Sequence, residues 1–101
     1  MIKHTVCWKL KDYAKGNTKN KNSEILQAKL FELKQYIPHI VSLEVGLTST
    51  LASKDNWDIV LIVKFPPLAD LEKYQNHPEH LKVVEFVKWI KDKRVCVDYE
   101  F

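Results

Sequence analysis

Trp57-Asp58-Ile59-Val60-Leu61-Ile62-Val63-Lys64-Phe65 constrains the architecture more than any other segment of the chain. Its residues alternate as in a β-strand, and every odd-numbered position is apolar. The even-numbered side carries the aliphatic residues Val60 and Ile62, although an antiparallel strand with one face in water should be polar there. Two apolar faces need two covering layers. The segment therefore predicts helices on one side of its sheet and a second copy of the chain on the other.

Upstream, the pattern predicts one strand and one helix. Residues 2–10 alternate, and one face carries His4, Val6, Trp8 and Leu10. A polar loop is expected over residues 11–22. Asn22 or Ser23 can then cap a helix, because their side chains accept hydrogen bonds from N–H groups of the first turn. Leucines at helical spacing mark its buried stripe, and Pro38 ends it.

Downstream, the remaining elements follow from the same patterns. They are a strand over 41–48, a turn-rich segment over 49–56, a break at Pro66-Pro67, helices over 68–76 and 78–92, and a last strand over 94–101. The order is β-α-β-β-α-β, the ferredoxin-like arrangement of an α+β protein, with an antiparallel sheet and helices on one face. A two-fold homodimer with sheet facing sheet is the simplest closed solution for the remaining apolar face.

Composition narrows the class of protein. The 101 residues are the length of one ordinary domain, and 46% hydrophobic with 29% charged residues is a globular mixture. The net charge of +3 is small, and we interpret the basic stretch over 9–21 as a solvated loop. Neither a membrane-length apolar run nor a signal-peptide pattern is present, and Cys7 and Cys96 lack metal-type spacing. We expect a cytoplasmic protein that binds neither nucleic acid nor membrane.

The densest group of acid/base side chains is Tyr74-Gln75-Asn76-His77-Pro78-Glu79-His80. Imidazole titrates near neutral pH. Pro78 suits the first position of a helix, so His77 is expected mainly to serve the turn before it. Three interpretations of this group compete, and in the first His80 acts as a general base while Tyr74 positions or polarises a carbonyl or enolate oxygen. A metal site built from His77, His80 and His4 is less favoured, since no acidic or cysteine ligand is evident beside them, and a purely structural role is the third interpretation.

These segments together resemble a known family. Three features carry the resemblance: the opening strand Ile2-Lys3-His4-Thr5-Val6, the element order, and Tyr74-x-x-His77-Pro78-x-His80 before an aromatic-rich helix. Together they are similar to the stress-responsive A/B barrel family (dimeric α/β barrel, Dabb), and the resemblance spans essentially the whole chain. The resemblance implies a homodimer whose two sheets form a barrel-like core.

The resemblance also implies roles for individual residues. A plant polyketide cyclase of this family uses a histidine and a tyrosine at this same spacing, without a metal or an organic cofactor. Carried over, its base is His80, its assisting tyrosine is Tyr74, and its first-strand histidine is His4. An ungapped match places Ile59 where that enzyme has a histidine, so the pocket of the cyclase is not reproduced.

The functional expectation is therefore a small apolar pocket between sheet and helices. His80 and Tyr74 would perform cofactor-free cyclase, lyase or isomerase chemistry on a carbonyl-containing small molecule, and His4 would orient it. The expected wall residues are Trp8, Ile59, Leu61 and Leu81. A non-catalytic stress-response or ligand-binding module is the alternative, and a barrel-type monooxygenase is a weaker one.

Overall fold

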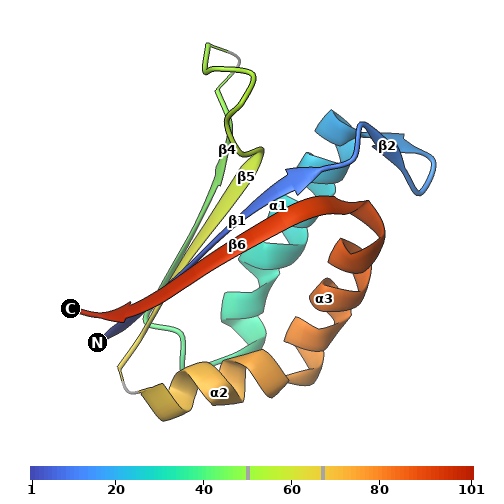
Figure 1. Ribbon diagram of the computed structural model, residues 1–101. Helices are drawn as coiled ribbons and strands as arrows, with labels where there is room; N and C mark the ends of the chain where they lie inside the picture. The colour runs from blue at the N-terminus through green and yellow to red at the C-terminus, as the bar shows by residue number, and fades with distance from the viewer. Residues whose placement is uncertain (50, 67) are drawn as a thin grey trace.

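A four-stranded antiparallel sheet with helices on one face forms the body of the molecule (Figure 1). The computed structural model describes residues 1–49, 51–66 and 68–101. Its elements are β1 (Ile2–Leu10), β2 (Tyr13–Ala14), β3 (Asn17–Thr18), α1 (Lys19–Tyr36), β4 (Ser42–Leu47), β5 (Ile59–Phe65), α2 (Leu68–Asn76), α3 (Pro78–Ile90) and β6 (Lys91–Glu100). The sheet order β4-β5-β1-β6 confirms the predicted ferredoxin-like arrangement.

The two faces of the sheet differ as β5 predicted. On β1 and β5 every second residue is buried against the helices, and the residues between them are half-buried on the outer face. Strand pairing aligns Val95, Cys7 and Val60 in one row across β6, β1 and β5, and Val97, Thr5 and Ile62 in the next. This outer face remains apolar at β6, where the exposed fractions are 43% for Val95 and 56% for Val97.

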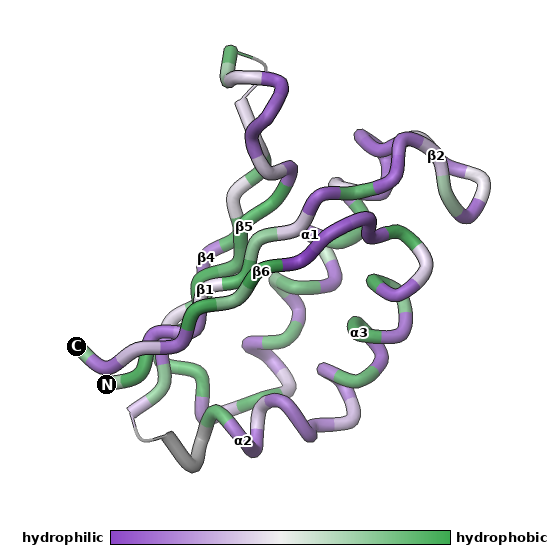
Figure 2. The backbone as a smooth tube through the Cα atoms, viewed as in Figure 1, coloured by the Kyte–Doolittle hydropathy of each residue, from purple (hydrophilic) through white to green (hydrophobic). Residues whose placement is uncertain are grey.

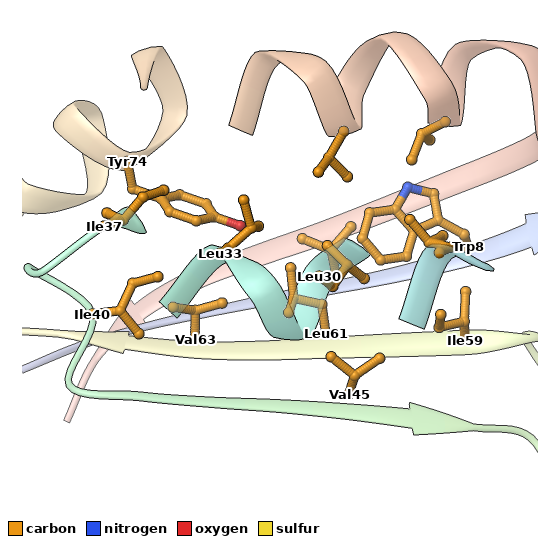
Figure 3. Close-up of a cluster of buried hydrophobic side chains, with 14 of the residues drawn as sticks. Trp8, Leu30, Leu33, Ile37, Ile40, Val45, Ile59, Leu61, Val63 and Tyr74 are labelled. Atoms are coloured by element: carbon orange, nitrogen blue, oxygen red, sulfur yellow. The ribbon is translucent and has the colours of Figure 1, made fainter. Parts of the chain in front are cut away.

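The helix-facing side carries the hydrophobic core. Leucines of α1 meet the apolar residues of β5 (Figure 3). Helix α3 completes the layer with its buried residues Val83, Val87 and Ile90. Full burial of one such side chain stabilises the fold by about 1.5–3 kcal/mol. Figure 2 shows hydrophobic residues concentrated in the middle of the strands, and mostly hydrophilic residues in the β2–β3 hairpin and the start of α1. Among the described residues, no helix is long and apolar enough to cross a membrane.

The predicted start of the first helix is wrong. Helix α1 begins at Lys19, and Thr18 is its N-cap, with its hydroxyl accepting a hydrogen bond from the Lys21 N–H at 3.3 Å. Neither Asn22 nor Ser23 caps it. Asn22 is fully buried instead, and its amide donates to the Ala14 carbonyl at 3.0 Å.

A hairpin within the expected loop explains the difference. Strands β2 and β3 are joined by Lys15 and Gly16, which both have positive φ, 51° and 77°. Two positive φ values in a two-residue hairpin are characteristic of a type I′ turn, usually signalled by Asn-Gly or Asp-Gly. Lys-Gly gives a weaker signal, so the polar sequence by itself predicts only a loop.

Other boundaries shift by a few residues. Helix α3 ends at Ile90, before the predicted limit of 92, and β6 follows at once from Lys91. His77 is the N-cap of α3 as expected, because its Nδ1 accepts from the Glu79 N–H at 3.1 Å. Strand β5 ends at Phe65, before the predicted Pro66-Pro67 break, but Pro67 lies outside the described residues, as does Thr50 of the turn-rich segment.

Candidate active site

A pocket of about 440 Å³ lies between α3 and the helix-facing side of the sheet. Its walls are mainly apolar and include Val6, Trp8, Leu30, Leu61, Val83 and Val87. Its polar lining consists of His4, His80, Lys88, Lys91 and Arg94. Pockets of about 300–1,000 Å³ with apolar walls and a few convergent polar groups are typical of small-molecule sites.

The structure brings four of the seven candidate residues to this pocket: His80, His4, Trp8 and Leu61. Ile59 is buried in the core, and Leu81 is 51% exposed; neither contributes to the lining. Leu81 points outward because it is rotated by about 100° from His80 around the helix. Tyr74 also lies outside the lining, although its ring packs against that of His80.

His80 sits in the first turn of α3 with one ring nitrogen engaged. Its Nδ1 lies 3.0 Å from the main-chain carbonyl oxygen of Gln75. A carbonyl oxygen can only accept, so Nδ1 carries the proton, and Nε2 of the neutral ring holds the lone pair. Burial lowers the pKa of His80; the Gln75 hydrogen bond opposes this, and the nearby charges of His4 and Arg94 lower the pKa further. His80 is therefore neutral at pH 7 and available as a base through Nε2.

Tyr74 reaches into the core from α2. It is fully buried, and its ring centroid lies 4.4 Å from that of His80, 5.1 Å from Phe65 and 5.9 Å from His4. Figure 3 shows its hydroxyl directed along the layer between helices and sheet. Among the residues that the structure describes, this hydroxyl has no hydrogen-bond partner. Burial raises the pKa of Tyr74, so the phenol stays protonated and remains a donor.

His4 is held by β6, the neighbouring strand. It is buried, with 2% exposed, and its Nδ1 is hydrogen-bonded to the carboxylate of Asp98, which lies directly opposite in the strand register. The Cys96 Sγ is 3.6 Å from the same nitrogen and 3.5 Å from Asp98 Oδ1. These three side chains each offer one potential metal-ligand atom, and the three atoms lie within 4.8 Å of one another. Imidazole nitrogen, thiolate sulfur and carboxylate oxygen are all atoms that transition metals bind. In this structure Asp98 engages the His4 nitrogen, which fixes the orientation of the ring.

The less favoured metal combination of His77, His80 and His4 is not assembled among the described residues. His77 uses its Nδ1 to cap α3, and His80 uses its Nδ1 on Gln75. The donor group that does converge joins His4 to Cys96 and Asp98.

Arg94 was missed by the sequence reasoning. It lies opposite Trp8 on β6, lines the pocket, and is the one arginine of the chain. Its positive charge lowers the pKa values of His80, Tyr74 and Cys96, although burial still raises the last two overall. Alternation along the strand places Arg94 on the face opposite Val95 and Val97. This pattern indicates the pocket only when it is known that β6 pairs with β1.

Comparison with known proteins supports the fold. A dimeric protein of unknown function with a ferredoxin-like fold from Bacteroides fragilis is 31% identical, with a TM-score of 0.78 over 99% of this chain and 95% of that chain. A hydroxynitrile lyase from Passiflora edulis is 19% identical, with a TM-score of 0.76 over 97% and 90%. An antibiotic biosynthesis monooxygenase is 15% identical, with a TM-score of 0.69 over 100% and 98%. The last two likenesses concern the fold alone.

The family assignment follows from the sequence match. The chain has no match among curated protein sequences. Residues 2–101 match the family described as Stress responsive A/B Barrel Domain, which is essentially the whole chain. This match establishes that the chain belongs to the stress-responsive A/B barrel (Dabb) family.

Proposed function

We propose that this protein is a homodimeric enzyme that performs cofactor-free acid/base chemistry, of the cyclase, lyase or isomerase type, on a carbonyl-containing small molecule. The observation that carries the proposal is the pocket of about 440 Å³ with His80 on its wall, where the ring Nδ1 lies 3.0 Å from the Gln75 carbonyl oxygen and burial lowers the pKa of the imidazole. The Passiflora edulis hydroxynitrile lyase, which has the same fold, supports the idea that this scaffold accommodates lyase chemistry.

The reaction begins with proton transfer to His80. Nε2 takes the proton from a carbon next to the substrate carbonyl, and the C–H electron pair moves to form an enolate whose charge rests on oxygen. The imidazolium then returns the proton to carbon or to a leaving atom, so no external oxidant or reductant is needed. A neutral imidazole with a lowered pKa is suited to this cycle near pH 7.

Tyr74 stabilises the enolate oxygen. Its hydroxyl is a protonated donor without a partner among the described residues, and its ring packs against that of His80. The hydroxyl is buried and lies outside the pocket lining, so the pocket wall at His80 must rearrange before a substrate oxygen contacts it. His4, oriented by Asp98, holds the substrate, while Trp8 and Leu61 form apolar wall.

The homodimer forms through the outer sheet face. The rows containing Val97 and Ile62 present apolar surface there, and a second copy would cover it. The dimeric relative from Bacteroides fragilis supports this assembly. The pocket lies on the helix-facing side, so this dimer leaves it accessible.

Hydrogen exchange tests the catalytic proposal with model compounds, so the natural substrate need not be identified first. A panel of small ketones, 2-oxoacids and 3-oxoacids is incubated with the protein in D₂O, and loss of the α-proton signal is followed by NMR. We expect accelerated exchange for at least one class, loss of that acceleration in His80→Ala, and retention in the matched control His39→Ala. Exchange that is equal in the wild type and His80→Ala rejects the proposal.

Binding without turnover is the second candidate function. The observation that favours it is the position of Tyr74, which is fully buried and lies outside the pocket lining. In that case compounds of the panel bind in the pocket, but no α-proton exchanges. The barrel-type monooxygenase is supported by likeness of fold alone.

A further inference from the structure

We propose that this pocket selects an amphipathic anion: a ligand with an apolar body and a carboxylate that pairs with Arg94. The inference deepens the proposed function, on which it rests for the catalytic use of the ligand, by naming the class of substrate. The observation behind it is the composition of the lining. Three cationic side chains, Lys88, Lys91 and Arg94, border the pocket, and its lining includes no aspartate or glutamate.

These cations are available to a ligand. Within the part of the chain that the structure describes, the ion pairs involve other side chains, and none joins Lys88, Lys91 or Arg94 to a carboxylate. Asp98, four residues further along β6, is hydrogen-bonded to His4. A bound carboxylate would therefore find positive charge that no carboxylate of the described residues neutralises, although the Arg94 side chain also contacts Cys96.

The two lysines have an ordinary structural explanation. Lys88 lies in the last turn of α3 and Lys91 is its C-cap. Cations are favoured at helix C-termini because the helix dipole is negative there. Lys88 and Lys91 are therefore expected to contribute a positive field and little selectivity of their own.

Arg94 has no such explanation. It lies within β6, beyond the end of α3, on the helix-facing side of the sheet, where its strand partner is Trp8. Its positive charge acts on both acid/base candidates, because it favours the deprotonated forms of His80 and Tyr74 and so lowers their pKa values. A chain with 16 basic residues has its one arginine here, and guanidinium is the side chain best suited to bind a carboxylate through two parallel hydrogen bonds.

The arrangement also places the two parts of the ligand. The carboxylate end lies at Arg94, and the apolar body extends along Val6, Leu61 and Val87. His80 lines the same pocket, so a carbonyl carried on that body comes within reach of Nε2. The positive field of Arg94 further stabilises negative charge that develops on the carbonyl oxygen.

Matched ligand pairs test the selectivity. The probes are 4-phenylbutanoate and hexanoate, each compared with its neutral amide, and dissociation constants are measured by NMR titration of the ¹⁵N-labelled protein. We expect each acid to bind at least about tenfold more tightly than its amide, a difference of about 1.4 kcal/mol. Arg94→Gln should remove this preference, Arg94→Lys should keep part of it, and Lys93→Gln, the neighbouring exposed cation, should leave it unchanged.

Several outcomes overturn the inference: amides that bind as tightly as the acids, an acid preference that survives in Arg94→Gln, or no binding by any acid of the pairs. Circular dichroism confirms that each variant is folded, and the retained charge of Arg94→Lys keeps the test valid if Arg94→Gln is unstable. The same titrations on His80→Ala separate this inference from the proposed function. Acid selectivity without α-proton exchange in the wild type rejects catalysis and leaves the ligand class standing.

Discussion

Replacing Tyr74 with phenylalanine is expected to raise stability while lowering activity. The hydroxyl is fully buried and has no hydrogen-bond partner among the described residues. A buried polar group without a partner costs about 1–3 kcal/mol of desolvation free energy. Phenylalanine keeps the ring contacts with Phe65 and His80, at 5.1 and 4.4 Å between centroids, and removes only the oxygen.

The expected gain in the free energy of unfolding is at the lower end, about 1 kcal/mol, because the missing oxygen leaves a small void in the packed layer. For a domain of this size, that corresponds to a Tm increase of about 4–8 °C. Activity should fall by about 100-fold or more, the usual effect of removing one hydrogen bond to a developing oxyanion. A residue that serves only the core would show the gain in stability without the loss of activity.

The assay pairs calorimetry with α-proton exchange, both at one protomer concentration, because the proposed dimer would make Tm depend on concentration. Tyr36→Phe is the matched control, since Tyr36 is 50% exposed and surface changes stay within about 0.5 kcal/mol. A Tyr74→Phe variant destabilised by about 1 kcal/mol or more would refute the reasoning, because it would mean that the hydroxyl has a stabilising partner.

Three further predictions concern the base, the interface and the helix start. The rate of α-proton exchange should rise with pH and level off above the pKa of His80, which lies below the ordinary value of about 6.5. Because the charge of Arg94 lowers that pKa, the Arg94→Gln variant should show the rise at higher pH. A rise at the same or a lower pH in this variant counts against His80 as the base. Val97→Lys places a charge on the outer sheet face and should give a monomer, as measured by light scattering. Leu81→Lys, on the exposed side of α3, is the control and should leave the proposed dimer intact. A dimeric Val97→Lys variant would argue for another interface. Thr18→Ala removes the N-cap of α1 and should cost about 0.5–2 kcal/mol in denaturant unfolding, while an unchanged midpoint would place the start of the helix elsewhere.

The fold was predictable because apolar periodicity sets it. The two apolar faces of β5 identified a sheet with one side against helices and the other side apolar, and Pro78 after His77 located the start of α3. The start of α1 was not predictable in the same way. It depends on Asn22 turning inward to bond Ala14, a contact that exists only after the β2–β3 hairpin has formed.

The site was predictable where position along one element decides it. His80 follows the cap of α3 by three residues, and His4 shares a strand face with Trp8, so local pattern places both. Arg94 and Asp98 depend on the register between β1 and β6, which pairs residues about 90 positions apart. No local pattern encodes that register, so the partner of His4 and the cation of the pocket emerged only from the structure.

The protonation of His80 tests the central claim most directly, because every proposed step needs a neutral ring with Nε2 free. Long-range ¹H–¹⁵N NMR of the ring distinguishes the two neutral tautomers and follows the titration. We predict the Nδ1–H tautomer at pH 7, with a pKa below the ordinary histidine value. An Nε2–H tautomer, or a ring that is still charged at pH 7, would contradict the account.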